Sequence, residues 1–415
     1  MSVAWTAYRS LAPLLGAAAP LGRWIAPAPE RSAWSERLGE VHDAEPADAW
    51  IHAASMGEAV AVSGLLAELR RDAPSSRLRL TATTRTGRQR LIDLGEHATL
   101  APLDTPQAAA RFFDHVRPKC LVLLETELWP QWLIAARRAQ APVLVLNARL
   151  SARSLERYRW LGAAFTELIA GLQAVLCQSD TDRDRWLALG ASPVRTSTVG
   201  NLKNDGLPSP AADRGTARAA LGLDPARPLW VLGSVRPGEA RHLAEAWTAM
   251  PGEARDRWQV VAVPRHANAT AGLRREAQEA GVAEATGVPE HGAWRWDDRP
   301  GVLAGYYAAA ELAYVGGTLE PYGGHNPLEP AACAAAVLTG PHLEAQGPAA
   351  QTLQAQGAIE IAAPGAALAS ALRALLTDPS LLKHRADASL AAANRARGAT
   401  RRAVDRLREW TLWPR

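Results

Sequence analysis

Short apolar runs alternate with helical patterns along almost the whole chain of 415 residues. The first run, 48–53, is followed by apolar residues at helical spacing, namely Val62, Leu65, Leu66 and Leu69. Repetition of a strand and then a helix predicts a mostly parallel sheet with helices on both faces. Further strands are expected at 77–82, 120–125, 142–147, 173–177, 228–233, 258–263, 311–315, 335–338 and 358–361.

A proline-rich break, Leu-Pro-Ser-Pro-Ala at 207–211, interrupts this alternation and indicates a linker. The chain is therefore expected to be an α/β protein with two doubly wound, Rossmann-like domains that face a cleft. The predicted domains are 31–206 and 213–395, joined by a linker at 207–212. Residues 396–415 are expected to form a C-terminal helix that packs back on the first domain. Because ligands of such sheets bind at the C-terminal ends of the strands, the loops after the strands are the first places to search.

A glycine-rich loop follows the strand expected at 311–315, in the sequence Val-Gly-Gly-Thr-Leu-Glu-Pro-Tyr-Gly-Gly-His-Asn-Pro-Leu-Glu-Pro-Ala. Gly316 and Gly317 let the backbone pass close to a bulky group. Pro327 suits the first turn of a helix, whose free N–H groups and dipole attract a phosphate. Glu329 can accept two hydrogen bonds from a ribose diol. With Asn326, this loop is a candidate nucleotide site.

Two other unusual stretches also follow strands. Residues 50–58 read Trp-Ile-His-Ala-Ala-Ser-Met-Gly-Glu, and residues 125–130 read Glu-Thr-Glu-Leu-Trp-Pro. With Gly-Gly-His-Asn-Pro-Leu-Glu-Pro at 323–330, they resemble, in the same order, the 3-deoxy-D-manno-octulosonic acid (Kdo) transferases of lipopolysaccharide synthesis. Shorter matches to the same family lie at 147–151, 178–179, 200–203 and 263–266.

The resemblance implies the GT-B architecture of glycosyltransferases. It also implies an inverting transferase that moves Kdo from CMP-Kdo to a lipid A precursor. Two alternatives remain open from the residues: another GT-B nucleotide-sugar transferase or epimerase, and a non-catalytic paralogue that binds lipid or nucleotide.

Glu58 is the candidate general base for the acceptor hydroxyl. It follows Gly57 at the expected start of a helix, where a glutamate is also common simply because the helix dipole stabilises it. The resemblance implies the catalytic role, since this glutamate of the His-Ala-x-Ser-x-Gly-Glu motif is the family's proposed base. His52 is interpreted as structural.

The acceptor side is assigned to Ser55, Arg85, Glu125, Glu127 and Arg149. The two acids at 125 and 127 stand beside Trp129, so they can hold acceptor hydroxyls or position Arg149. A salt-bridge network within the loop is the equal alternative for the same two acids.

The donor side is assigned to Ser234, Arg236 and Arg265, together with the glycine-rich loop that contains Gly316, Gly317, Asn326 and Glu329. Residues 233–239 follow a strand and open a helix, so backbone N–H groups and Arg236 can bind a phosphate. The family pattern here is Gly-Ser-Thr-His-x-Gly-Glu-Glu, and this chain has Val235, Arg236 and Ala240 instead. Lys203 can neutralise a leaving group or can be an ordinary solvated lysine.

No metal or cofactor is expected, because a helix dipole and arginines can replace a metal and no Asp-x-Asp site stands out. The net charge of +4 permits anionic partners and does not require nucleic acid, which is not a predicted partner. The resemblance implies CMP-Kdo as the donor and a lipid A precursor as the acceptor, and a membrane surface is the third expected partner.

Residues 1–30 are expected to associate with a membrane. An uncharged run at 10–22 lies between Arg9 and Arg23 and is shorter than the about 20 residues that span a bilayer. A helix in the membrane interface, anchored by Trp5 and Trp24, is the preferred interpretation, with a helix packed on the first domain as the alternative.

Seven arginines between 70 and 90 form either a basic patch or a solvated helix end. The expected location is the cytoplasmic face of the bacterial inner membrane.

Overall fold

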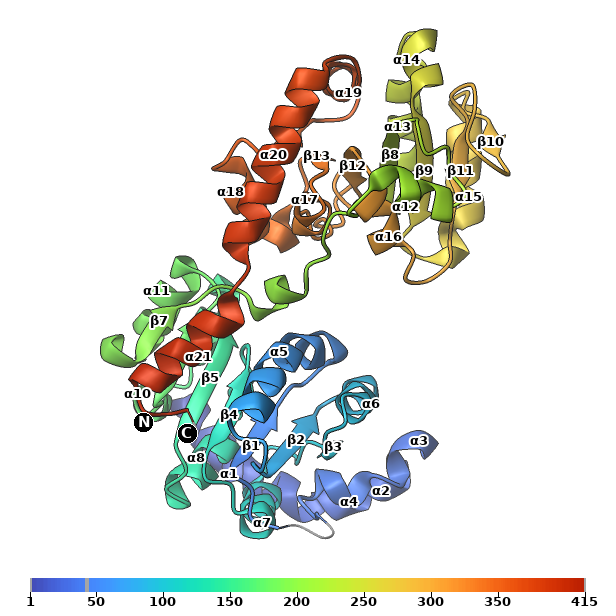
Figure 1. The fold of residues 1–415 in the computed structure, drawn as a ribbon. Coiled ribbons are helices and arrows are strands. Elements are labelled where there is room, and N and C mark those ends of the chain that lie inside the picture. Colours follow the sequence, from blue (N-terminus) through green and yellow to red (C-terminus); the bar gives the residue numbers. More distant parts are fainter. Residues whose placement is uncertain (1, 42–44, 414–415) are drawn as a thin grey trace. The chain divides into compact units, whose positions relative to one another are not determined.

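The computed structural model describes residues 2–41 and 45–413, which form two compact units (Figure 1). Unit 1 comprises Met1–Gly206 and Gly398–Arg415, and unit 2 comprises Leu207–Arg397. The extreme ends of the two predicted terminal segments, residues 1 and 414–415, lie outside the described part. The α/β fold class is confirmed in both units, because each is a parallel sheet covered by helices.

Unit 1 contains a seven-stranded parallel sheet whose strand order reverses at β1. Strand β1 pairs in parallel with β2 on one side and with β4 on the other. In spatial order the strands are β3 (Ala98–Leu100), β2 (Leu78–Ala82), β1 (Ala49–His52), β4 (Leu121–Leu124), β5 (Val143–Ala148), β6 (Ala174–Cys177) and β7 (Thr196–Thr198). The two edge strands, β3 and β7, were not predicted, because three-residue strands carry too little periodicity.

Both faces of this sheet are buried, as a parallel sheet requires. Trp50 and Ile51 are fully buried on opposite faces, in separate apolar clusters. The face of Ile51 is covered by α5 (Met56–Asp72), α6 (Arg85–Asp93) and α21 (Ala399–Glu409). The face of Trp50 is covered by α1 (Val3–Ala18), α7 (Pro106–Val116), α8 (Pro130–Arg138), α9 (Ala152–Arg159), α10 (Ala163–Ala170) and α11 (Asp180–Leu189). The short helices of unit 1 are η1 (Ala19–Leu21), α2 (Gly22–Ile25), α3 (Ala28–Arg31), α4 (Trp34–Arg37), η2 (Pro193–Arg195) and η3 (Leu202–Gly206).

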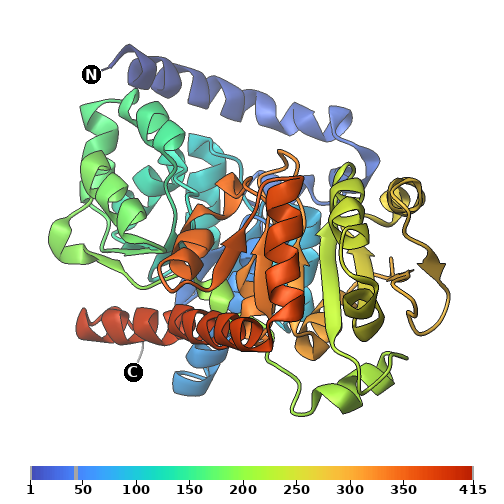
Figure 2. The same ribbon diagram turned by 90° about the horizontal axis from the view of Figure 1, so that it is seen from above.

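The N-terminal helix α1 has two different faces. Trp5 is only 4% exposed and packs against Tyr8 and Phe165, so the expectation that Trp5 anchors a membrane is wrong. Trp24, in contrast, is 68% exposed. Figure 2 shows α1 and the short helices after it as the dark blue segment that starts at the end marked N. The other large exposed apolar side chains of this segment are Val3, Leu11, Leu14, Leu15, Leu21 and Ile25. No helix within the described residues is long and apolar enough to cross a membrane.

The arginines between 70 and 90 are mostly paired with acids. The pairs are Arg70–Glu96, Arg71–Glu68, Arg77–Glu45 and Arg88–Glu36. Arg85 and Arg90 are exposed and have no ion pair among the described residues. The free basic surface in this segment is therefore smaller than seven arginines suggested.

Unit 2 repeats the architecture with a second seven-stranded parallel sheet, whose order reverses at β8. Its strands, in spatial order, are β10 (Glu284–Ala285), β11 (Trp294–Trp296), β9 (Gln259–Pro264), β8 (Leu229–Val235), β12 (Leu312–Val315), β13 (Ala336–Thr339) and β14 (Ile359–Ile361). Its helices are α12 (Arg214–Ala220), α13 (Glu239–Thr248), α14 (Gly252–Arg257), η4 (Ala267–Ala269), α15 (Thr270–Glu279), α16 (Leu303–Ala309), α17 (Leu328–Ala332), η5 (Glu344–Gln346), α18 (Gly347–Gln354), α19 (Ala366–Thr377) and α20 (Pro379–Ala396).

The chain returns to unit 1 at its C-terminal end. Gly398 has a left-handed backbone (φ 78°) and separates α20 from α21. The Asp205 carboxylate caps α21 by accepting hydrogen bonds from the N–H groups of Ala399 (3.1 Å) and Thr400 (2.7 Å). The inner face of α21 joins the core of unit 1 through Ala403, Val404 and Leu407. The C-terminal helix thus belongs to unit 1.

Candidate active site

The unusual sequence stretches lie where the strand order of each sheet reverses. In unit 1 the loops after β1 and β4 hold residues 53–55 and 125–129, and these two strands are neighbours at the reversal. In unit 2 the loops after β8 and β12 hold residues 236–238 and 316–327, again at the reversal. Adjacent loops diverge at such a point, which leaves room for a ligand at the C-terminal ends of the strands.

Glu58 lies in the first turn of α5 and is only 7% exposed. Its Oε2 accepts a hydrogen bond from the Ala54 N–H (2.9 Å), and its Oε1 accepts one from the Ser55 hydroxyl (3.1 Å). The Ser55 Oγ in turn accepts the Glu58 N–H at 3.4 Å. This reciprocal arrangement is a variant of the capping box, and it fixes the direction of the carboxylate.

The pKa of Glu58 is raised to about 7, chiefly because burial disfavours the charged form. The negative charges of Glu125 and Glu127 raise it further, against the opposing hydrogen bonds of Ala54 and Ser55. A carboxyl group with this pKa can take up a proton near neutral pH.

Glu125 and Glu127 have separate partners, and neither acid contacts Arg149. Glu125 has a left-handed backbone (φ 57°), and its Oε1 lies 2.7 Å from the Lys203 ammonium. Lys203 is therefore an ion-pair partner within the site. The Arg149 side chain is exposed and has no hydrogen bond or ion pair within 2–41 and 45–413, so the idea that the two acids position it is wrong. The backbone carbonyl of Arg149, in contrast, accepts a hydrogen bond from the Thr126 hydroxyl.

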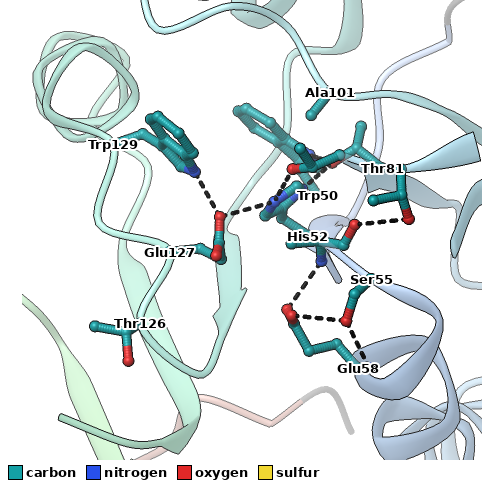
Figure 3. A network of polar contacts seen from close by, with 12 residues as sticks. Trp50, His52, Ser55, Glu58, Thr81, Ala101, Thr126, Glu127 and Trp129 are labelled. Carbon is teal, nitrogen blue, oxygen red and sulfur yellow. Dashed lines mark hydrogen bonds and ion pairs between the residues drawn. The ribbon is translucent and has the colours of Figure 1, made fainter. Parts of the chain in front are cut away.

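Glu127 is held by aromatic and imidazole groups (Figure 3). The Trp129 indole N–H donates to Glu127 Oε2 at 2.8 Å, and His52 Nε2 lies 3.6 Å from the same oxygen. His52 is fully buried, and burial lowers its pKa. On its other side, His52 Nδ1 is 2.8 Å from the Thr81 hydroxyl, which also accepts the Trp50 indole N–H at 2.8 Å. The sequence offered no sign of Thr81, because it lies inside a strand with no motif around it.

Ser55 and Arg85 occupy different situations. Ser55 is the N-cap of α5 and is bonded directly to Glu58. Arg85 opens α6 after β2, and its side chain is exposed. Of the five residues assigned to the acceptor, the structure therefore joins Ser55, Glu125 and Glu127 around Glu58 through contacts or charge, whereas Arg85 and Arg149 stand apart from that network.

In unit 2, Ser234 lies within β8 and not in the loop after it. Its backbone is left-handed (φ 56°), and the pairing of β8 with β9 shifts register between Gly233 and Val235. Ser234 is thus a β-bulge. A Cβ on Gly316 would lie 2.1 Å from the Ser234 carbonyl oxygen. Gly316 therefore allows the loop after β12 to pack against the bulge of β8, whereas Gly317 supplies a left-handed turn (φ 74°).

Glu239 organises these loops, a role that was not predicted from the sequence. It is fully buried, and its carboxylate accepts hydrogen bonds from five groups. These are the backbone N–H groups of Arg236 (2.8 Å), Gly317 (2.8 Å), Thr318 (2.8 Å) and Leu319 (2.9 Å), and the Tyr314 hydroxyl (2.6 Å). One sequence feature could have indicated it: a Gly-Glu pair follows the first strand of each sheet, at 57–58 in unit 1 and at 238–239 in unit 2.

Arg236 and Arg265 lie beside two histidines. The Arg236 guanidinium lies 4.2 Å from the centre of the Tyr322 ring, and its Nη1 donates to His266 Nε2 at 3.2 Å. The buried Nε of Arg236 has no partner among the described residues. The pKa of His325 is lowered to about 4 by burial and by the charges of Arg265 and Arg236. Arg236 and Arg265 thus provide two positive charges and several N–H donors, a combination that can bind an anion.

The nucleotide loop starts its helix differently from the prediction. Pro327 is the N-cap, and α17 has only five residues, so a strong helix dipole aimed at a phosphate is not available here. Asn326 Oδ1 accepts the Leu328 N–H at 3.1 Å, which is a capping contact. Burial raises the pKa of Glu329, while Arg265 and Asn326 oppose that rise. Asn326 and Glu329 thus stand at one short helix start, with Arg265 as the nearby positive charge.

Comparison with known proteins adds family information. A family model for "3-deoxy-D-manno-octulosonic-acid transferase (kdotransferase)" matches residues 32–206. The 3-deoxy-D-manno-octulosonic acid transferase of Bordetella pertussis is 35% identical over 426 residues, covering 97% of this chain and 98% of that protein. The enzyme of the same name from Haemophilus influenzae is 30% identical, covering 92% of each.

Two solved structures share the fold. The Anabaena protein HepE in complex with UDP has a TM-score of 0.63 at 12% identity, covering 88% of this chain and 99% of that one. UDP-GlcNAc 2-epimerase from Neisseria meningitidis, bound to UDP-GlcNAc, has a TM-score of 0.61 at 13% identity, covering 87% and 99%. At these identities the likeness concerns the fold alone.

Replacement of Glu239 by Gln should destabilise unit 2. A glutamine keeps one acceptor oxygen and turns an N–H₂ group toward backbone donors, so several buried N–H groups lose their partner. We expect a loss of about 3 kcal/mol in the free energy of unfolding, measured by urea denaturation. Glu253→Gln, on exposed helix α14, is the matched control and should change nothing. Equal stability of the two variants would contradict the organising role of Glu239.

Proposed function

Because the chain belongs to the 3-deoxy-D-manno-octulosonic acid (Kdo) transferase family, we propose that it moves Kdo from CMP-Kdo to a lipid A precursor with inversion at the anomeric carbon. Membership of this family, together with the GT-B fold, indicates a glycosyltransferase that transfers Kdo in lipopolysaccharide synthesis. The nucleotide donor, the lipid acceptor and the stereochemistry are the proposal.

The observation that carries the proposal is the contrast between Glu58 and Glu239. Both follow a glycine after the first strand of a sheet, but Glu239 accepts five hydrogen bonds and Glu58 accepts two. The carboxylate of Glu58 has acceptor capacity left, and its pKa is about 7. Such a group is suited to removing a proton from a hydroxyl near neutral pH, whereas the fully bonded Glu239 is not.

In the proposed reaction the acceptor hydroxyl loses its proton to Glu58 as its oxygen bonds to the anomeric carbon of Kdo. The bond from that carbon to the phosphate oxygen breaks, and CMP leaves with the electron pair. Because one displacement exchanges the two groups, the configuration inverts.

The donor residues are proposed in unit 2. The Arg236 side chain is half-buried and the Arg265 side chain is exposed, so both guanidinium groups can present donors to the phosphate or the sugar carboxylate. Ser234, Gly316 and Gly317 shape the loops, and Asn326 and Glu329 are proposed to bind the nucleoside. The acceptor is proposed to contact Ser55, Glu125 and Glu127, with Arg85 and Arg149 contributing charge at the surface.

We further propose that the enzyme works at the cytoplasmic face of the inner membrane. The exposed apolar side chains of α1 and α2, flanked by Arg9 and Arg23, support attachment to an anionic lipid surface. A groove of about 590 Å³ beside α1 also carries Arg9 and Arg138.

The direct test is incubation of the purified protein with CMP-Kdo and a lipid A precursor, followed by mass measurement of the lipid. We expect the mass of the lipid to increase by one or more Kdo residues. An unchanged lipid mass, under conditions in which an established Kdo transferase is active, would contradict the proposed donor and acceptor.

In the same assay, Glu58→Gln should lower turnover by about 10²–10⁴-fold, because the proton of the acceptor has no base. Since the raised pKa is about 7, the wild-type kcat should fall as the pH decreases below 7 and level off above it. The residual activity of the variant should lack this inflection. Glu68→Gln, on the same helix, is the matched control. Near-normal turnover of Glu58→Gln would remove this residue from the mechanism.

Glu329→Ala and Asn326→Ala should each weaken CMP binding by about tenfold, because each removes polar contacts with the nucleoside. Isothermal titration calorimetry with CMP measures the effect, and affinity for the lipid acceptor should stay unchanged. Glu253→Ala, distant in sequence and exposed, serves as the control. Unchanged CMP affinity in both variants would place the nucleoside elsewhere.

Replacement of Leu11, Leu14, Leu15 and Ile25 by Gln should release the protein from vesicles that contain anionic phospholipid. These side chains are exposed, whereas deletion of the whole segment would also remove the buried Trp5. High salt should weaken the remaining attachment, because each basic residue near an anionic surface contributes about 1 kcal/mol. The control replaces the exposed Val194 and Val288 by Gln. If the variant with Gln at positions 11, 14, 15 and 25 co-sediments with the vesicles as much as the wild type does, the protein is not attached through α1.

A further inference from the structure

A buried hydrogen-bonded chain leads from the core of unit 1 to the surface beside Glu58. Thr81 has one hydroxyl hydrogen, and its oxygen already accepts the Trp50 indole N–H at 2.8 Å. The hydroxyl can therefore donate to His52 Nδ1, which lies 2.8 Å away. This assigns the imidazole proton to Nε2, the nitrogen that faces Glu127. The opposite tautomer would leave the Thr81 hydrogen without this acceptor and turn a lone pair toward a carboxylate.

The outer end of the chain is Glu127 and Trp129. His52 Nε2 lies 3.6 Å from Glu127 Oε2 and 3.5 Å from the Thr83 hydroxyl, so its N–H points between two acceptors. Contacts of this length are common in ligand-free sites and tighten in complexes. The Trp129 N–H donates to the same Oε2 at 2.8 Å. The other oxygen, Oε1, has no hydrogen-bond partner within the part of the chain that the structure describes.

The Trp129 ring is partly open to solvent and supported from behind. It is 36% exposed, and its centre lies 5.9 Å from that of Trp132. The Trp132 ring in turn packs against Trp50 and His52, at 4.9 Å and 4.8 Å. The Trp129 indole and the Glu127 carboxylate thus lie side by side, and the packed rings of Trp132 and His52 support them from within unit 1. Figure 3 shows Trp129, Glu127 and His52 in this arrangement.

This pair suits a sugar ring. A pyranose has an apolar face of C–H groups, which an indole can cover, and hydroxyl groups at its edge, which a carboxylate can bind. A ligand with only phosphate would be repelled by Glu127, and a purely apolar chain would leave Oε1 unpaired.

We propose that Trp129 and the free Oε1 of Glu127 form a subsite for a pyranose ring of the acceptor, and that His52 is a positioning residue that holds this subsite in place. The proposal rests on the proposed transferase activity and names one part of the acceptor that the site recognises. His52 acts only through Glu127 and does not touch the substrate.

The test measures KM for the lipid A precursor and for CMP-Kdo in matched variants. Trp129→Phe keeps an aromatic ring but removes the N–H that fixes Glu127, and Trp129→Ala removes both. We expect the acceptor KM to rise about tenfold in Trp129→Phe and further in Trp129→Ala, with the KM for CMP-Kdo unchanged. Trp160→Phe, at a 79% exposed tryptophan of the same unit, is the control and should match the wild type.

His52 is tested by two substitutions of different chemistry. His52→Gln retains an N–H donor and should stay within about threefold of the wild-type acceptor KM, whereas His52→Leu should raise it about tenfold. Combined with Glu127→Gln, His52→Leu should add almost nothing, because its effect passes through the carboxylate. Thermal unfolding of each variant separates this effect from loss of the fold. If the His52 variants do not fold, the tryptophan variants still decide the assignment of the subsite.

The outcomes separate the two proposals. A wild-type enzyme that transfers Kdo, with Trp129 variants that keep a normal acceptor KM, would overturn the sugar subsite alone. Full additivity of His52→Leu and Glu127→Gln would overturn the positioning role of His52. A wild type that neither modifies nor binds the precursor would overturn the proposed function, and the subsite with it.

Discussion

The reversal of strand order in each parallel sheet is the constraint on which the rest of the structure depends. All strands of a sheet point the same way, so every strand ends at the same edge, and only at the reversal do neighbouring loops turn apart. In unit 1 this brings the start of α5 next to the loop after β4, although about 70 residues separate them. In unit 2 it brings the bulge at Ser234 next to Gly316 and Gly317. The candidate site residues of each unit therefore lie in the loops at the reversal of its sheet.

The two units use the same local device for different ends. A Gly-Glu pair opens the first helix after the first strand of each sheet. In unit 2 the carboxylate is saturated by five donors and ties two loops together, so it acts as a structural centre. In unit 1 the carboxylate of Glu58 accepts two hydrogen bonds from the described residues, and burial, with the charges of two further acids, raises its pKa. The structural role of Glu239 and the base role proposed for Glu58 thus differ in how many hydrogen-bond partners surround the carboxylate.

The three neighbouring carboxyl groups of unit 1, Glu58, Glu125 and Glu127, are partly compensated by nearby donors and by one lysine. Three carboxylates in one region would repel each other strongly at low dielectric. Lys203 pairs with Glu125, and Glu127 receives the Trp129 N–H and faces the His52 ring. Glu58 has no cationic partner among the described residues, and burial, together with the charges of Glu125 and Glu127, raises its pKa to about 7. The raised pKa of Glu58 thus comes from burial first and from the two neighbouring acids second.

The sequence by itself determined the α/β class, ten of the strands, and the three motifs at 50–58, 125–130 and 315–331, because periodicity and glycine or proline chemistry are local properties. It could not determine the short edge strands, the bulge at Ser234 or the burial of Trp5, since these depend on which surface a segment meets. The partners of the charged residues could not be predicted either: Lys203 forms an ion pair with Glu125, and Arg149 contacts neither Glu125 nor Glu127. Glu58 and Glu239 are alike in sequence, and only the tertiary structure decided that Glu239 accepts five hydrogen bonds and Glu58 two. The physical reason is that hydrogen bonds and charge pairs form between segments far apart in the chain, whereas a sequence motif reports only on its neighbours.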